Sequence, residues 1–143
     1  MRVGFTGTQG GMTPAQKLHL PLLFLQAESF THGDCIGADV EAALIADLMG
    51  VPTIAMPCTI VAKRANYPST LVLPAKPPLE RNVDIVKNCD LLVAAPAENK
   101  EQLRSGTWAT IRRARDYGRR MIVLYPDGRL EVYTGTSIKS LWK

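Results

Sequence analysis

The sequence predicts a Rossmann-like, doubly wound α/β fold, in which helices cover both faces of a mainly parallel sheet. Three observations predict it. Strand-like and helix-like segments alternate along all 143 residues. The strand-like segments are short apolar runs, which is typical of parallel strands buried on both faces. The length fits one ordinary domain, so we assign residues 1–143 to a single domain.

The first strand covers residues 2–6 and ends in the glycine-rich stretch 7–11. Thr13 and Gln16 then have the spacing of a capping box, which marks the start of a helix. Pro21 lies inside this helix and is expected to kink it or split it, because proline removes a backbone hydrogen bond. The helix carries three leucines on one face, Leu18, Leu22 and Leu25.

The second strand and the helix after it occupy about residues 28–31 and 38–49. An amphipathic surface helix needs only one apolar stripe, but this helix has two. The second stripe predicts that a further surface covers it, so we expect a homodimer or a larger homo-oligomer. Gly50 ends the helix, and a third strand follows at residues 51–56.

A long connection at residues 57–78 contains five prolines and has no clear periodicity. Long connections often serve as functional lids or binding loops. Two interpretations of this segment are open, a lid over a binding site and part of a subunit interface. A helix follows at about residues 79–88, with Leu79, Val83 and Val86 expected to face inward.

The remaining elements complete the alternation. A strand covers residues 91–95, and Ser105 opens a helix that runs to Gly118. Two further strands, at 121–125 and 130–133, are separated by a Pro-Asp-Gly turn. Because connections between parallel strands are almost always right-handed, these units are expected to form a doubly wound sheet.

Composition argues against several classes of protein. No apolar run approaches the ~20 residues of a membrane-spanning helix, and the N-terminus does not resemble a signal peptide, so we expect a cytoplasmic protein with no membrane partner. Three widely spaced cysteines favour neither a zinc site nor a disulfide framework. His19 and His32 lack suitably spaced partners, so no metal is expected, and no cofactor is indicated. The net charge is +4, and the basic cluster between Lys100 and Arg120 suits phosphate, nucleic acid or plain solvation.

In a doubly wound sheet, ligands bind outside the carboxyl ends of the strands, where loops enter helices. Four segments of this sequence reach that edge, and they offer glycines for close backbone approach, hydroxyl groups and basic side chains, all suited to an anion. The predicted ligand-binding residues are Thr6, Gly7 and Thr8; His32, Gly33, Gly37 and Asp39; Arg81 and Asn82; and Arg104, Ser105, Gly106 and Thr107.

These segments also have purely structural interpretations. The glycine turn after the first strand departs from the G-x-G-x-x-G fingerprint and also suits a tight strand–helix connection. His32 suits either an acid–base role or a histidine satisfied by nearby backbone, and Asp39 suits either a ribose hydroxyl or the positive end of a helix dipole. These two residues are the candidate catalytic groups. The clearest feature is Ser105-Gly106-Thr107, because a helix N-terminus offers free N–H groups to an anion.

The stretch His32-Gly-Asp-Cys-Ile-Gly-Ala-Asp39, followed by Arg81-Asn82, Asp90 and Ser105-Gly106-Thr107, resembles the SLOG superfamily in order and spacing. That superfamily includes the DNA-processing protein DprA (Smf), the cytokinin-activating LOG enzymes and small standalone YspA-like members. The similarity to the YspA-like branch spans about residues 3–126, and residues 104–115 also resemble a DprA segment. The resemblance implies a Rossmann-like domain that binds nucleotides, nucleotide-derived signals or nucleic acid.

Three functions follow as expectations. The first is binding of a nucleotide or a related phosphorylated ligand, in sensing or signalling. The second is hydrolysis of an N-glycosidic bond, as in LOG enzymes; here Thr110 stands at the LOG glutamate position, and a hydroxyl cannot replace that carboxylate. Asp34, Asp39, Glu98 or Glu101 would have to substitute. The third is DprA-like binding of single-stranded DNA, which the basic cluster favours and an aromatic content of 6% does not.

Overall fold

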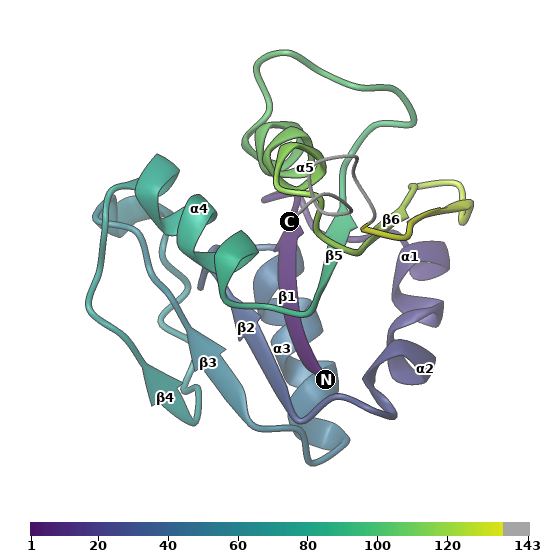
Figure 1. The fold of residues 1–143 in the computed structure, drawn as a ribbon. Coiled ribbons are helices and arrows are strands. Elements are labelled where there is room, and N and C mark those ends of the chain that lie inside the picture. Colours follow the sequence, from purple (N-terminus) through teal and green to yellow (C-terminus); the bar gives the residue numbers. More distant parts are fainter. Residues whose placement is uncertain (136–143) are drawn as a thin grey trace.

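Seven strands form one sheet in the computed structural model, which describes residues 1–135 (Figure 1). Their order is β4-β3-β2-β1-β5-β6-β7, and neighbouring strands are parallel except β6 and β7. The predicted mainly parallel, single-domain α/β fold is confirmed. The end of the predicted domain, residues 136–143, lies outside the described range. The strands are β1 (Arg2–Gly7), β2 (Ser29–His32), β3 (Thr53–Ala55), β4 (Leu71–Val72), β5 (Leu91–Ala95), β6 (Met121–Leu124) and β7 (Leu130–Tyr133).

Helices cover both faces of this sheet, as predicted (Figure 1). One face carries α1 (Pro14–Leu18), α2 (Leu20–Phe24) and α3 (Ala38–Leu48). The other face carries α4 (Pro78–Lys87) and α5 (Gly106–Asp116). Within residues 1–135, no helix combines the length and the apolar character needed to cross a membrane.

The predicted split of the first helix is confirmed, because α1 ends and α2 begins around His19. The capping box is present as well: the Thr13 hydroxyl accepts from the Gln16 backbone N–H, and the Gln16 side chain accepts from the Thr13 N–H at 2.9 Å. Pro21 has no N–H to donate to a carbonyl one turn earlier, so the helical ladder is interrupted. The three leucines predicted on one face are all exposed, Leu18, Leu22 and Leu25.

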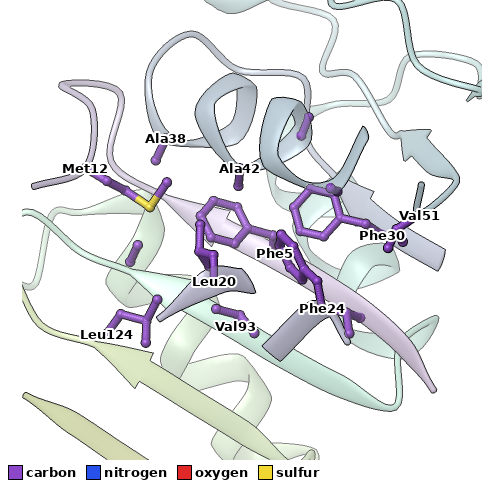
Figure 2. Close-up of a cluster of buried hydrophobic side chains, with 14 of the residues drawn as sticks. Phe5, Met12, Leu20, Phe24, Phe30, Ala38, Ala42, Val51, Val93 and Leu124 are labelled. Atoms are coloured by element: carbon purple, nitrogen blue, oxygen red, sulfur yellow. The ribbon is translucent and has the colours of Figure 1, made fainter. Parts of the chain in front are cut away.

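The core on the α1–α3 side is built around phenylalanines from three elements (Figure 2). Phe30 of β2 contacts Phe5 of β1 and Phe24 of α2, with ring centroids 5.7 and 5.0 Å apart. Buried alanines let α3 approach the sheet closely, because they add little bulk between helix and strands. These alanines are Ala38, Ala42, Ala43 and Ala46.

The inward face of α4 differs from the prediction. Val86 is buried and Val83 is half-buried, but Leu79 is 69% exposed and Arg81 is buried. The physical reason is that the Arg81 guanidinium finds backbone carbonyls at the ends of β2 and β3. A buried charge is retained where it is hydrogen-bonded, so α4 turns this side chain inward and leaves Leu79 outside.

The long connection 57–78 supplies an edge strand, β4, and a 3-10 turn, η1 (Val61–Lys63), neither of which the sequence predicted. It is fastened to the end of β2. The Asp34 carboxylate accepts from the backbone N–H groups of Asn66 and Tyr67 at 3.2 and 2.9 Å. Asp34 adopts a φ of 54° at this link, a value that aspartate tolerates better than most residues. This link holds the first part of the connection at the carboxyl edge of the sheet, and the chain then returns to the start of β3, where Thr70 forms hydrogen bonds with Thr53, before it enters β4. The roles of the connection as lid or interface stay predictions.

The chain order creates a switch point between β1 and β5. From β1 the strands run outward to β4, and β5 then returns beside β1 and starts the other half of the sheet. The chain leaves β1 toward α1 on one face and leaves β5 toward α5 on the other. In doubly wound sheets, a crevice opens between two loops that diverge in this way.

Candidate functional site

A cavity of about 190 Å³ lies at the switch point, outside the carboxyl ends of the strands, and we call it the switch-point cavity. All four predicted segments contribute to its wall. The predicted residues that line it are Thr6, Gly7, Thr8, Gly33, Asp39, Arg81, Asn82, Ser105, Gly106 and Thr107. Phe5 and Ile85 add an apolar floor. Residues that are distant in sequence thus share one hollow, as the fold class requires of a ligand site.

Arg81 is the charged anchor of this cavity. Its Nη1 donates to the Gly33 carbonyl at 2.6 Å and to the Met56 carbonyl at 3.1 Å, and its Nε donates to Asn82 Oδ1 at 2.8 Å. Its Nη2 lies 3.6 Å from Cys35 Sγ. The side chain is 7% exposed and forms no ion pair with a carboxylate among the described residues. Its hydrogen-bond partners are neutral, and its charge also lowers the pKa of the nearby Asp39 carboxyl group. A buried guanidinium without an ion pair favours an anionic ligand.

Asp39 organises the loop after β2. Its Oδ2 accepts from the backbone N–H groups of Gly33 and Cys35 at 3.0 and 3.1 Å. Its Oδ1 is buried and has no hydrogen-bond partner within residues 1–135. Burial raises the pKa of Asp39 to about 6, against the opposing effect of the two backbone N–H groups and Arg81. The cavity wall therefore contains a carboxyl group that gains or loses its proton near neutral pH.

The N-terminus of α5 supplies hydrogen-bond donors to the cavity. Ser105 caps the helix, because its Oγ accepts from the Trp108 backbone N–H at 3.2 Å. The backbone N–H groups of Gly106 and Thr107 have no acceptor in the described part of the chain, as is usual in a first helical turn. The hydroxyl groups of Thr6 and Thr107 also make no hydrogen bond there. Free donors and the helix dipole together favour a negative group at this point.

His32 lies outside the cavity lining, although it was a candidate catalytic residue. The ring is fully buried, its Nδ1 accepts from the Asp34 backbone N–H at 3.0 Å, and its Nε2 lies 2.8 Å from Ser69 Oγ. Burial lowers the pKa of His32 to about 4, so the imidazole is neutral at pH 7. These contacts match the structural interpretation, in which the histidine ties β2 to the 57–78 connection.

Two other predicted residues, Gly37 and Arg104, also lie outside the lining. Gly37 has a φ of 90° at the start of α3, and an added Cβ would collide with the Gln9 carbonyl. Glycine is therefore required there by the backbone and by close approach of the loop after β1. Arg104 is exposed in the loop before α5.

Six lining residues are outside the predicted ligand-binding set: Gln9, Cys35 and Glu98, and the apolar Phe5, Ile85 and Ala97. Cys35 is 8% exposed, and burial raises the pKa of its thiol, which keeps it protonated. Glu98 is half-buried, and its Oε1 accepts from the Trp108 indole N–H at 3.0 Å. Cys35 and Glu98 each follow the end of a strand by three residues. This short distance from the carboxyl edge of the sheet is the sequence feature that could have indicated them.

Of the four carboxylates considered as substitutes for the LOG glutamate, two line the switch-point cavity and two do not. Asp39 and Glu98 line the switch-point cavity. Asp34 instead binds the 57–78 connection, and Glu101 pairs with two arginines of α5. Thr110 donates to a backbone carbonyl one turn earlier and lines a small hollow between α4 and α5, not the cavity.

The chemistry of the cavity combines donors for an anion with two carboxyl groups. The donors are the guanidinium, the helix N-terminus and hydroxyl groups, and they suit a phosphate oxygen. The carboxyl groups suit hydroxyl or amino groups on the same ligand. Within the described residues, no group of three or more His, Cys, Asp and Glu side chains is placed to hold a metal ion.

No family model matches the sequence, and no curated protein matches it either. Among solved structures, the chain is similar to the X-ray structure of TM1055, a Northeast Structural Genomics Consortium target. The two chains are 16% identical, and the match covers 87% of this chain and 74% of TM1055 with a TM-score of 0.64. At this identity the likeness concerns the fold alone. This chain therefore has a Rossmann-like fold that it shares with TM1055.

Proposed function

We propose that this chain binds a phosphorylated, nucleoside-derived ligand in the switch-point cavity. One observation carries the proposal. The buried guanidinium of Arg81 lines the same cavity as Gly106 and Thr107, whose backbone N–H groups have no acceptor within residues 1–135, at the point where doubly wound sheets bind their ligands. A phosphate group accepts hydrogen bonds from all of these donors, and the helix dipole adds to the attraction.

The sequence resemblance supports the same class of ligand. The SLOG-like segments, His32 to Asp39, Arg81-Asn82 and Ser105 to Thr107, all contribute to the cavity wall or hold it in place. We propose that the chain is a standalone, YspA-like member of that superfamily, and that its role is binding in sensing or signalling.

Calorimetry and thermal shift with inorganic phosphate and the four ribonucleoside 5′-monophosphates test this function. A ligand that prefers the folded protein raises its Tm. Thr107→Val and Arg81→Lys should each weaken binding about tenfold, since one removes a donor and the other removes the planar fork. Arg113→Ala is the matched control, because Arg113 is exposed on α5 outside the cavity. Unchanged affinity in both cavity variants would refute the proposed site.

A second function, hydrolysis of an N-glycosidic bond, is favoured by one observation: Asp39 and Glu98 line the same cavity. Glycoside cleavage uses two carboxyl groups in different protonation states. Asp39, whose pKa is raised to about 6, would protonate the leaving base. Glu98 would stabilise the positive charge on the sugar and take a proton from the attacking water. The products are a free base and a sugar phosphate.

Chromatography of nucleotides incubated with the protein tests this second function. Glu98→Gln should abolish release of free base and keep nucleotide affinity, because glutamine still accepts the Trp108 N–H. Glu101→Gln is the matched control, since Glu101 pairs with arginines away from the cavity. If no nucleotide yields free base with the wild-type protein, this second function is wrong and the binding function stands alone.

The third expected function, binding of single-stranded DNA, has less support. Such surfaces combine positive charge with aromatic side chains on which bases stack. Trp108 is 3% exposed and belongs to the core, and two arginines of α5 are already paired with Glu101. A steep dependence of oligonucleotide affinity on salt would reverse this ranking.

The expected homo-oligomer has support in the outer surface of α3. The alanines of this helix face the sheet, while Leu44 and Leu48 are 49% and 79% exposed. Exposed leucines of α1 and α2 lie on the same side of the sheet. We propose that copies of the chain associate there. Sedimentation velocity of the wild type and of Leu48→Glu tests this association, which the charge should weaken.

A further inference from the structure

The switch-point cavity is too small to enclose a whole nucleotide. Cavities that bury most of a ligand of this size have about 300–1,000 Å³. This one has about 190 Å³, and its lining is mainly polar. Its strongest donors suit the phosphate, so the base of a nucleotide bound there has to lie beside the cavity.

A second cavity, of about 300 Å³, opens on the other side of Arg81, and we call it the α4 cavity. Arg81, Asp84 and Asn88 face the α4 cavity at intervals of three and four residues, which place them along one stripe of the helix. Asn82 and Ile85 face the switch-point cavity. The remaining walls of the α4 cavity are Met56, Pro57, Leu73, Pro74 and Lys76.

Arg81 is a fixed wall that both cavities share. Its Nη1 donates to the carbonyl of Gly33, which lines the switch-point cavity, and to that of Met56, which lines the α4 cavity. Its Nε is held by Asn82 Oδ1 at 2.8 Å. Moving the guanidinium would break these bonds in a buried place, which is costly. A ligand that spans both cavities therefore passes a rigid, planar cation on which a ring can stack.

The chemistry of the α4 cavity suits a nucleobase. A base has two apolar faces and an edge of donors and acceptors. Four side chains give the cavity an apolar wall: Met56, Pro57, Leu73 and Pro74. The other lining residues are polar: Lys76 Nζ lies 2.7 Å from Asp84 Oδ2, and Asn88 Nδ2 donates to the Asp84 carbonyl. The amide oxygen of Asn88, which has no donor among the described residues, and the charged pair can meet the edge of a base.

We infer that the α4 cavity is the base-binding subsite of the ligand whose phosphate occupies the switch-point cavity. The nucleotide then spans Arg81. This inference rests on the proposed function, and it adds a second set of residues that no sequence pattern indicated.

The test compares two probes, ribose 5-phosphate and the ribonucleoside 5′-monophosphate that binds most tightly. Pro74→Trp fills the mouth of the α4 cavity from an exposed position, and Leu73→Ala removes part of the apolar wall. Both variants should bind the nucleotide about tenfold more weakly and ribose 5-phosphate with less than about a twofold change. Leu130→Trp is the matched control, because Leu130 is exposed on β7, at the edge of the sheet opposite β4, and lines neither cavity.

The outcomes separate this inference from the function on which it rests. If Pro74→Trp and Leu73→Ala leave nucleotide affinity unchanged, or weaken both probes equally, the base does not lie in the α4 cavity and the inference is wrong. If the wild type binds neither probe, or if Thr107→Val and Arg81→Lys both leave ribose 5-phosphate binding intact, the proposed function is wrong and this inference falls with it. Circular dichroism checks the fold of each variant, and Leu73→Ala keeps the test decisive if tryptophan at position 74 disturbs folding.

Discussion

Replacing Gly33 by alanine tests whether the position of the Arg81 guanidinium depends on the absence of a side chain at residue 33. An added Cβ would lie 2.5 Å from Arg81 Nη1, 2.8 Å from Arg81 Cζ and 3.0 Å from Asp39 Oδ2. The guanidinium cannot retreat without weakening its bonds to the carbonyls of Gly33 and Met56. Overpacking costs about 1–3 kcal/mol, and a lost hydrogen bond to a charged group costs roughly 1.5–3 kcal/mol. We therefore expect the free energy of unfolding to fall by about 2–4 kcal/mol.

Urea denaturation measures this loss, and Gly10→Ala is the matched control. A Cβ at Gly10 would have its nearest neighbour at 3.6 Å, the Thr8 Oγ1, so we expect a change of at most about 0.5 kcal/mol. Phosphate affinity should also fall in Gly33→Ala, because the displaced guanidinium no longer faces the cavity. A loss below about 1 kcal/mol in Gly33→Ala would show that Arg81 moves aside at little cost. The fixed wall between the two cavities would then be refuted.

Three further predictions concern the groups that surround the site. The pKa of Asp39, raised to about 6 by burial, lies above its value in the unfolded chain, so its contribution to stability is present below about pH 4 and is lost as the pH rises through 6. In urea denaturation, the free energy of unfolding of the wild type, relative to that of Asp39→Asn, should fall between pH 4 and 7. The titration of His32 contributes equally to both proteins, so it cancels in this difference. A difference that stays constant with pH contradicts the prediction. Gln16→Met removes an amide that donates to the Pro96 and Leu124 carbonyls, both at 2.8 Å. In chemical denaturation it should lower the free energy of unfolding by about 2–4 kcal/mol. Gln26→Met, at an exposed site, is the control and should change it little. Ser105→Ala should lower stability by about 1 kcal/mol through loss of the N-cap, and Ser105→Thr should restore most of it in the same assay.

Local rules of chain geometry explain what the sequence predicted well. The capping box at Thr13 and Gln16 and the interruption at Pro21 each depend on residues within one or two turns. The strands β1 and β5 are apolar runs buried on both faces, so their pattern needs no knowledge of their neighbours. The shared cavity follows from one topological rule, because loops at the carboxyl ends of β1, β2 and β5 meet when the sheet is parallel.

The features that were missed depend on contacts between distant parts of the chain. β4 has only two residues, both exposed, and it is a strand only because β3 lies beside it. An arginine in the first turn of a helix ordinarily points to solvent, and Arg81 turns inward because carbonyls from two other strands receive it. The α4 cavity depends on the same contacts, since its walls come from residues 56–57, residues 73–76 and α4.

The link between Asp34 and the 57–78 connection determines where the chain can change in length. Residues 63–67 are held in register, because the Lys63 carbonyl accepts from Ile36 and three successive N–H groups, from Ala65 to Tyr67, donate to Asp34. One residue inserted between Lys63 and Tyr67 would put the bonds on its two sides out of register with each other. Val61 is 70% exposed, and the cost of closing a loop grows only slowly with its length. A reporter peptide grafted at Val61 would therefore sit near the carboxyl edge of the sheet and leave the anchored segment intact.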